Sequence, residues 1–279
     1  MHNLPIPDID DMVVFDTCIS VKPAALRQRF ETARNGVSAA YANYADRGTN
    51  DLLLGIQSIL PFEHIALTTQ EFRQLYAGQV LHKSGPARSI YDKIQLAARR
   101  CPFCSHGAPR TLDHFLPKES FAEFSVLSKN LVPCCRDCNG AKHSKVISAD
   151  EQFFHPYFDQ ISGGTWLECR LDYGGGTPAP VFYVNMAAEG VAEPVLKKLE
   201  YQFGKLGLSA IYGTQAIDEI EGQMRYLCRL HQAGGTDEVT AFLAEQVESK
   251  AGHSVNSWQA ALYRGLFRDA NFSAMEWNV

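Results

Sequence analysis

Two matching cysteine motifs in the middle of the chain constrain its fold more than any other feature. The first is CPFC at 101–104, and the second is CRDC at 135–138. Two Cys-x2-Cys motifs can supply the four thiolates of a tetrahedral zinc site that has no open coordination position. Such a site stabilises a segment that is too short to have a core of its own. We therefore predict structural zinc on Cys101, Cys104, Cys135 and Cys138.

The other cysteines leave two alternatives open. The four motif cysteines could be two unrelated pairs of buried or redox-active residues, although neither motif has the βαβ context of a thioredoxin-like site. Cys134 could replace Cys135 through a Cys-x3-Cys spacing, but two matching motifs favour Cys135. The cysteines outside this segment are expected to be buried apolar residues. They are Cys18, Cys169 and Cys228.

Length and composition are those of a globular protein without a membrane segment. The chain has 279 residues, 46% of them hydrophobic, which is enough for one large domain or two smaller ones. No apolar run approaches the ~20 residues that span a bilayer, and the N-terminus lacks the features of a signal peptide. We expect a cytoplasmic protein, in whose reducing surroundings cysteines favour metal binding over disulfides.

The pattern of apolar residues predicts helices on both sides of the cysteine-rich segment. The predicted helices before it cover 23–46, 68–81 and 87–100, with Thr68 or Thr69 as the cap of the second. The predicted strands after it cover 165–173 and 180–186, and helices follow from about residue 190. We expect a helical region over 1–100, a central module over 101–160, and a short β-hairpin followed by a helical region over 161–279.

A short polar motif lies between the two cysteine pairs. Asp113 and His114 are adjacent in TLDHFLPK. On a strand, adjacent side chains point to opposite faces, so that one can bind a metal while the other meets a water molecule. An isolated Asp-His pair is more often a surface pair or a turn. Its place between the cysteine motifs, with Asn130 further along and Asn139 directly after the last cysteine, favours a functional site.

The order of these residues resembles that of the HNH, or ββα-metal, nucleases. The shared pattern is Cys-x2-Cys, Asp-His, Asn and Cys-x2-Cys-Asn-x2-Lys, and it covers 101–145, about a sixth of the chain. It is most similar to the zinc-stapled branch, in which a ligand directly follows the last cysteine. The resemblance implies an α+β fold, mostly α, in which a ββα-metal module with a four-cysteine zinc site is flanked by helical regions. It also implies a metal-dependent DNA endonuclease.

The same resemblance implies a role for each polar residue of the motif. Asp113 and Asn139 would bind a catalytic Mg²⁺ or Mn²⁺, and His114 would be the general base that activates water. Asn130 would brace the loop that carries His114. Asn139 takes a position that is histidine in many members of the family and asparagine in others. The residue types suit these roles, because carboxylate and amide oxygens are hard donors and neutral histidine accepts a proton near pH 7.

Basic residues near the motif are candidates for contact with a DNA backbone. Residues 82–145 hold eleven Lys or Arg and five Asp or Glu, in a chain whose net charge is −5. A basic segment in an acidic chain suits local contact with phosphates, and a solvated face is the alternative. The candidates are Lys118, Arg136, Lys142 and Lys145, and Lys142 is also a candidate catalytic residue.

Three further histidines lie in or near the segment. His143 follows Asn139 at i+4, so on a helix both would face the same way. We interpret His143 as a third metal ligand or a phosphate contact, with an ordinary surface histidine as the alternative. His106 and His155 are expected to be structural.

A looser similarity extends beyond the motif. The run LDHFLPKESFAEFSVLSKNLVPCCRDCNGAK, with FHPYFD and SWQAALYRGLF after it, resembles HNH proteins of bacterial anti-phage defence. The examples are Septu-type and retron-associated systems, whose HNH subunits work beside an ABC-type ATPase. This resemblance implies an ATPase partner that the helical flanks would hold, with a plain scaffold as the alternative.

A function of a different class is a zinc-stapled module that binds nucleic acid or a protein partner without catalysis. Such a module needs the four cysteines and the basic residues. It does not need Asp113, His114 and Asn139 together in this order. The presence of all three favours an enzyme.

Overall fold

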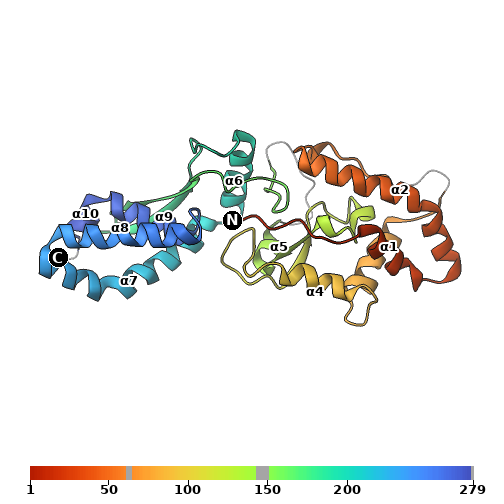
Figure 1. Ribbon diagram of the computed structural model, residues 1–279, viewed down its shortest axis with the longest axis horizontal. Coiled ribbons are helices and arrows are strands. Elements are labelled where there is room, and N and C mark those ends of the chain that lie inside the picture. The colour runs from red at the N-terminus through yellow and green to blue at the C-terminus, as the bar shows by residue number, and fades with distance from the viewer. Residues whose placement is uncertain (61–64, 143–150, 278–279) are drawn as a thin grey trace. The chain divides into compact units, whose positions relative to one another are not determined.

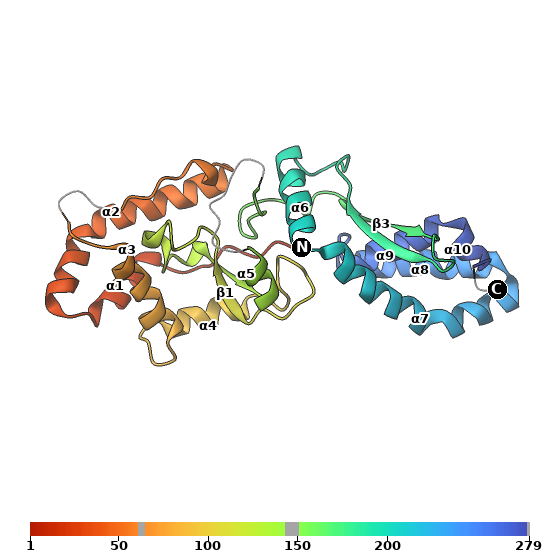
Figure 2. The ribbon, with the colours of Figure 1, turned by 180° about the vertical axis from the view of Figure 1, so that it is seen from behind.

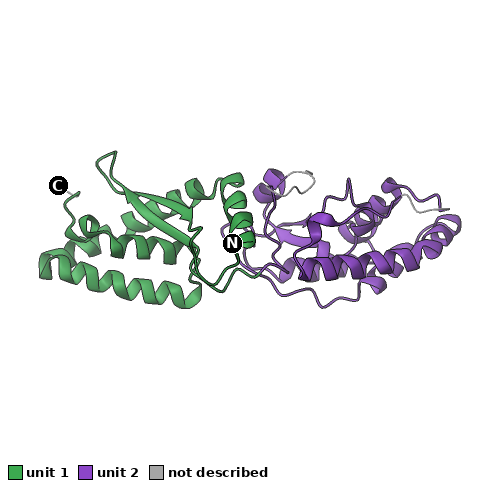
Figure 3. Ribbon diagram, turned by 90° about the horizontal axis from the view of Figure 1, so that it is seen from above, with its two compact units in different colours: residues 1, 160–279 green, residues 2–159 purple. Residues whose placement is uncertain are grey.

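The computed structural model describes residues 1–60, 65–142 and 151–277, which are mostly helical and include two small β-sheets (Figure 1). The expected class, α+β and mostly α, is confirmed. The chain forms two compact units, called here the first unit (residues 2–159) and the second unit (residues 160–279 with Met1) (Figure 3). No helix of the described ranges is both long and apolar enough to cross a bilayer.

The first unit contains the cysteine-rich segment and the helices that precede it. Its α-helices are α1 (Asp11–Ser20), α2 (Ala24–Thr49), α3 (Thr69–Leu75), α4 (Arg88–Leu96) and α5 (Arg136–Lys142). Its other helical segments are the 3₁₀ turns η1 (Leu53–Gly55), η3 (Ala122–Phe124) and η4 (Ser128–Asn130) and the π-helix η2 (Tyr76–Leu81). Its strands are β1 (Thr111–His114) and β2 (Leu131–Cys134).

Aromatic residues join the N-terminal helices of the first unit. Phe30 of α2 packs edge-to-face against Phe15 of α1, with ring centroids 6.1 Å apart, and against Phe72 of α3 at 5.1 Å. Further along α2, Tyr44 packs on Phe124 at 5.1 Å. All five rings are buried. The long helix α2 therefore connects the N-terminal core to the loop between β1 and β2.

The predicted helix over 68–81 divides into two kinds of helix. Thr68 caps α3 with a capping box, in which its hydroxyl accepts from Glu71 N and Glu71 accepts from Thr68 N. After Leu75 the helix continues as the π-helix η2. Apolar spacing reports which face of a helix is buried, and it does not distinguish α from π winding. The sequence pattern therefore predicted one continuous helix over 68–81.

The two strands of the first unit form an antiparallel pair that leads directly into α5. Thr111 lies opposite Cys134, and His114 lies opposite Leu131. α5 begins at Arg136, with a single residue separating it from the end of β2, and packs against β1 (Figure 2). This strand, strand and helix arrangement places the polar motif of β1 beside the residues that follow the second cysteine pair.

The second unit is a β-hairpin covered by helices. The strands are β3 (Leu167–Asp172) and β4 (Ala179–Val184), and the helices are α6 (Glu193–Lys205), α7 (Leu208–Gly234), α8 (Thr236–His253), α9 (Trp258–Arg268) and α10 (Ala270–Ala274). α9 packs on both α8 and β3, and α7 packs on β4. Gly265 permits this close approach, because a Cβ there would lie 2.6 Å from the Cys169 carbonyl oxygen.

The cysteines outside the cysteine-rich segment differ in burial. Cys18 and Cys169 are buried, as expected for apolar residues. Cys228 is half-buried instead. It lies on α7 next to Leu227, which is buried. Cys228 is therefore at the edge of the helix face that packs on the core.

Candidate metal centre and active site

The four cysteines of the two motifs come together in the first unit. Their sulfur atoms all lie within 4.8 Å of one another, and all four side chains are buried. The amide of Gly107 donates to Cys104 Sγ at 3.3 Å, and the amide of Cys138 donates to Cys135 Sγ at 3.4 Å. Amide donors stabilise thiolates, the form in which cysteine binds a metal. The cluster can hold a metal ion such as zinc.

Cys134 lies outside this cluster although it is next to Cys135. It ends β2, and its Sγ lies 3.4 Å from Thr111 Oγ1. Burial raises the pKa of Cys134 to about 12, whereas hydrogen bonding with Cys101 lowers the pKa of Cys135 to about 7. Position therefore favours Cys135, whose sulfur lies with those of Cys101, Cys104 and Cys138. The choice of Cys135 over Cys134 as a member of the cluster is confirmed.

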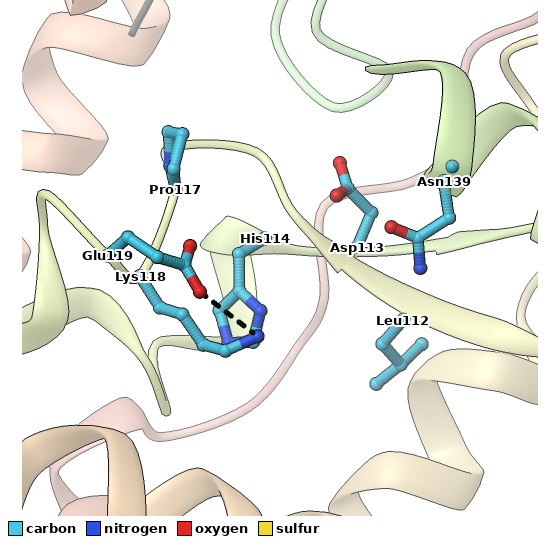
Figure 4. A pocket seen from close by; sticks show the side chains of 8 residues that line it. Leu112, Asp113, His114, Pro117, Lys118, Glu119 and Asn139 are labelled. Carbon is cyan, nitrogen blue, oxygen red and sulfur yellow. Dashed lines mark ion pairs between the residues drawn. The ribbon is translucent and has the colours of Figure 1, made fainter. Parts of the chain in front are cut away.

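A pocket of about 240 Å³ lies beside β1 and the start of α5 (Figure 4). Its lining consists of Leu112, Asp113, His114, Pro117, Lys118, Glu119, Asn139 and Gly140. The side chains of Asp113 and Asn139 lie next to each other on one side of it (Figure 4). Asp113 is buried and Asn139 is half-buried. A carboxylate and an amide oxygen are ligands that suit Mg²⁺ or Mn²⁺, so this side of the pocket has the chemistry of a divalent-metal site.

Thr111 orients the amide of Asn139. The Thr111 hydroxyl donates to the Cys134 carbonyl at 3.0 Å and accepts from Asn139 Nδ2 at 3.1 Å. Because the amide nitrogen is used in this bond, the amide oxygen is directed toward the Asp113 side of the pocket (Figure 4). β1 thereby positions both oxygen ligands: it carries Asp113 itself, and Thr111 holds Asn139 by a hydrogen bond.

Lys142 is bound inside the site. Its side chain is 8% exposed, and its Nζ lies 2.8 Å from Asp113 Oδ2. The ammonium also donates to the carbonyl oxygens of His114 at 3.1 Å and Phe115 at 2.9 Å. Burial raises the pKa of Asp113, and the charge of Lys142 opposes this shift. Lys142 is therefore the counter-charge of Asp113, and its side chain points inward instead of toward the surface where a DNA backbone would lie.

His114 extends from β1 on the side opposite Asp113 (Figure 4). Its Nε2 lies 2.9 Å from the Ser125 carbonyl, and its ring packs edge-to-face on Tyr76 with centroids 4.4 Å apart. A carbonyl only accepts, so Nε2 carries the proton and Nδ1 keeps its lone pair. Burial first, and then the positive charge of Lys118, lowers the pKa of His114 to about 3. The ring is therefore neutral at neutral pH, with an unprotonated Nδ1.

Asn130 binds the backbone of the loop that follows His114. The side chain is fully buried. Its Oδ1 accepts from Leu116 N at 2.7 Å and from the Tyr44 hydroxyl at 3.0 Å. Its Nδ2 donates to the carbonyl oxygens of Leu116 at 3.1 Å and Phe124 at 3.2 Å. The geometry is that of the expected brace, and it also ties the loop to α2 through Tyr44.

The other candidate basic residues differ in their surroundings. Lys118 is half-buried at the pocket, with its Nζ 3.9 Å from Glu119 Oε1. Arg136 is exposed at the start of α5. Lys145 and His143 lie outside the described residues, so their expected roles stay predictions.

His155 has a structural position. Its Nε2 lies 3.2 Å from the Tyr44 hydroxyl, and its Nδ1 accepts from Tyr157 N at 3.2 Å. The ring is buried and packs at a tilt against Phe115, with centroids 4.0 Å apart. One ring nitrogen thus contacts α2, and the other binds the backbone of its own loop. His106 lies in the loop after the first cysteine pair and does not line the pocket.

Several residues around the pocket were missed by sequence reasoning. They are Tyr44, Arg73, Tyr76 and Thr111. Strand alternation could have identified Thr111, because residues two apart on a strand lie on the same face. Thr111 and Asp113 are such a pair on β1. The other three lie on helices far from the motif in sequence, and no local pattern connects them to it.

The comparisons with known proteins found one similarity that spans most of the chain. The chain is 29% identical to protein ea31 of Escherichia phage lambda over 223 residues, which cover 74% of this chain and 74% of the relative. No family model and no solved structure matches the chain.

Proposed function

We propose that this chain is an HNH endonuclease that hydrolyses phosphodiester bonds of DNA with the help of a divalent metal ion. The observation that carries the proposal is the pocket that Asp113, His114 and Asn139 line together (Figure 4). These residues come from β1 and α5, which lie beside the four-cysteine cluster. Oxygen ligands and a neutral histidine in one pocket are the groups that metal-assisted phosphodiester hydrolysis requires.

In the proposed reaction, His114 is the general base. Its Nδ1 takes a proton from the attacking water, while the bond from Nε2 to Ser125 O holds the ring in the required tautomer. Asn130 keeps the loop after β1 in place and so fixes the direction of the ring. Attack on the phosphate with loss of the 3′ oxygen gives 5′-phosphate and 3′-hydroxyl ends.

Asp113 and Asn139 are the proposed ligands of Mg²⁺ or Mn²⁺, which would supply charge stabilisation for the phosphate and the leaving oxygen. The residues present fit such an ion, because Asp113 and Asn139 offer a carboxylate and an amide oxygen on the same side of the pocket. The Asp113 carboxylate is now paired with the Lys142 ammonium and would have to turn from it to a metal. Lys142 has two other acceptors, the carbonyl oxygens of His114 and Phe115. These acceptors keep the ammonium satisfied when the carboxylate turns to a metal.

A nicking assay tests this proposal. Plasmid DNA should be nicked by the zinc-loaded chain with Mg²⁺ or Mn²⁺, and not when the divalent ion is omitted. His114→Ala should lower the rate by about 10²–10⁴-fold, as expected for loss of a general base. His106→Ala is the matched control, since His106 is a half-buried histidine outside the pocket. A folded His114→Ala protein that nicks at the wild-type rate would show that the base is another residue.

We extend the proposal to a role in anti-phage defence beside an ATPase. The basis is the looser resemblance of the chain to HNH subunits of such systems. The second unit has a core of its own and contributes no residue to the pocket, so it is free to hold a partner. The test is the same nicking assay with and without the product of the neighbouring gene, where activity is expected to rise in the complex.

A module that binds nucleic acid or a protein without cutting is the second candidate function. The buried ion pair between Lys142 and Asp113 favours this candidate, because the ammonium already pairs with the carboxylate that a metal would need as its ligand. This candidate predicts DNA binding without Mn²⁺ binding. Isothermal titration with Mn²⁺ therefore separates the nuclease from the binding module. Only the nuclease requires a second metal site, and Asp113→Asn should remove Mn²⁺ binding at that site.

A further inference from the structure

Two basic residues lie next to Glu119 of the pocket, and one of them comes from a helix that precedes the cysteine-rich segment. Arg73 is on α3, and its Nη2 lies 3.4 Å from Glu119 Oε1. Lys118 Nζ lies 3.9 Å from the same oxygen. Lys118 and Glu119 line the pocket together with His114 (Figure 4). One carboxylate oxygen is therefore shared by two cations at the candidate active site.

Stability does not explain this arrangement. The side chains of Arg73, Lys118 and Glu119 are 38%, 32% and 41% exposed, and ion pairs at such exposure contribute little to folding. Arg73 Nε is buried and has no hydrogen-bond partner among the described residues. Buried donors are nearly always paired. The fold thus leaves this donor unused, and because Nε is buried, a phosphate would bind the exposed part of the guanidinium, where Glu119 now lies.

The segment that follows Arg73 also contacts the site. The π-helix η2 begins at Tyr76, whose ring packs against His114 with centroids 4.4 Å apart. Lys118 Nζ lies 5.8 Å from the centroid of the same ring. π-helices in proteins are frequent at functional sites, where the extra residue redirects a side chain. α3 and η2 together therefore bring a cation to Glu119 and an aromatic ring to His114, which both line the pocket.

We propose that Arg73 and Lys118 bind a backbone phosphate of the DNA substrate, and that Glu119 occupies both cations when no DNA is bound. This inference rests on the proposed nuclease function and adds a substrate-positioning residue, Arg73, from outside the cysteine-rich segment. A guanidinium binds carboxylate and phosphate oxygens with the same planar donors, so Glu119 is an internal competitor for the phosphate. Its exposure leaves the carboxylate free to move aside.

DNA binding by the full-length, zinc-loaded chain tests this proposal. The probe is a fluorescein-labelled 20-base-pair duplex, and fluorescence anisotropy is measured without divalent metal at several salt concentrations. Arg73→Gln and Lys118→Gln should each raise Kd about fivefold or more and lower the slope of log K against log salt by about 1, because each removes a phosphate contact. Glu119→Gln should lower Kd by a similar factor.

The ion pair between Arg27 and Glu31 on α2 provides matched controls. Its distance is 3.5 Å, and its side chains are 44% and 47% exposed, close to the values of Arg73 and Glu119. Arg27→Gln and Glu31→Gln change the net charge equally and should change Kd by less than about twofold. The tightening caused by Glu119→Gln should also shrink when Arg73→Gln is present, since the competitor acts through Arg73.

The outcomes separate this inference from the proposed function. Binding by Arg73→Gln that equals binding by Arg27→Gln would overturn the inference, while wild-type nicking would leave the nuclease function intact. Tightening by Glu119→Gln that is unchanged in the Arg73→Gln background would overturn the competitor role. A wild-type chain that neither binds nor nicks the duplex would overturn both.

Discussion

At the residue scale, Asn130 links three parts of the first unit through one side chain. It holds the backbone of Leu116, the carbonyl of Phe124 and the hydroxyl of Tyr44. All of these groups are buried, so they have no access to water as a substitute partner. The loop that begins directly after His114 therefore depends on a single amide.

Replacement of Asn130 by Ala should destabilise the first unit by about 3 kcal/mol, because it leaves buried donors and acceptors without partners. Asn43→Ala on α2 is the control: Asn43 is exposed and should change the free energy of unfolding by no more than about 0.5 kcal/mol. The measurement is urea unfolding followed by circular dichroism. Equal effects of the two substitutions would contradict the bracing role.

The buried ring of His114 makes stability depend on pH. Burial lowers its pKa to about 3 in the folded chain, while the unfolded value is 6.5. Between these values the unfolded state binds more protons, so the stability contributed by His114 is complete above pH 6.5 and is lost as the pH falls toward 3. The loss should be about 1.4 kcal/mol for each pH unit below about 6.

A comparison with His114→Asn isolates this contribution. The zinc site also responds to acid, but it does so equally in both proteins. As the pH falls from 6.5 to 5, the unfolding free energy of the wild type should therefore decrease more than that of the variant. A difference that stays constant over this range would contradict a neutral, buried His114.

At the scale of elements, the four-cysteine cluster connects the turn after α4 to the junction of β2 and α5. Gly107 shows how close this contact is, since a Cβ there would lie 2.7 Å from Cys135 Cβ. The cluster thus fixes the loop after α4 against the start of α5. The same junction carries Asn139, so the metal site that holds the fold also positions a residue of the pocket.

Cys135→Ser should therefore reduce bound zinc from about one ion per chain to well below half, because it removes one of four thiolates. Cys134→Ser is the matched control, as a buried neighbouring cysteine outside the cluster. It should retain its zinc. The measurement is atomic emission after dialysis against a weak chelator. The reverse result would mean that Cys134 is the ligand.

At the scale of the whole molecule, the chain consists of two compact units with separate cores. The metal cluster and the pocket both belong to the first unit. The second unit is held by its own contacts, such as Asn256, whose side chain accepts from Trp166 N at 2.9 Å and donates to Gly164 O at 2.7 Å. Metal binding should therefore stabilise only one of the two units.

Scanning calorimetry should show two unfolding transitions. Removal of zinc by a chelator should lower the midpoint of one transition by at least about 10 °C, because metal binding contributes directly to the folding free energy of its unit. The other transition should stay in place. Cys101→Ser identifies the first-unit transition independently of the chelator. One transition that shifts as a whole would show that the units unfold together.

The sequence by itself determined those features that depend on local spacing. The Cys-x2-Cys spacing identified the four cluster residues, because two thiols three residues apart can bind one ion from a single turn. Strand alternation identified the opposite orientations of Asp113 and His114. Helical periodicity located most helices to within a few residues, as for α2 and α4.

Only the tertiary structure decided which residues surround the pocket. Lys142 was predicted to contact DNA, but the fold buries it against Asp113. Arg73 and Tyr76 contact the site from α3 and η2, which come before the cysteine-rich segment in the chain. No local sequence pattern connects these two residues to the pocket. Periodicity records which face of an element is buried, whereas the identity of its neighbours depends on contacts between segments far apart in the chain.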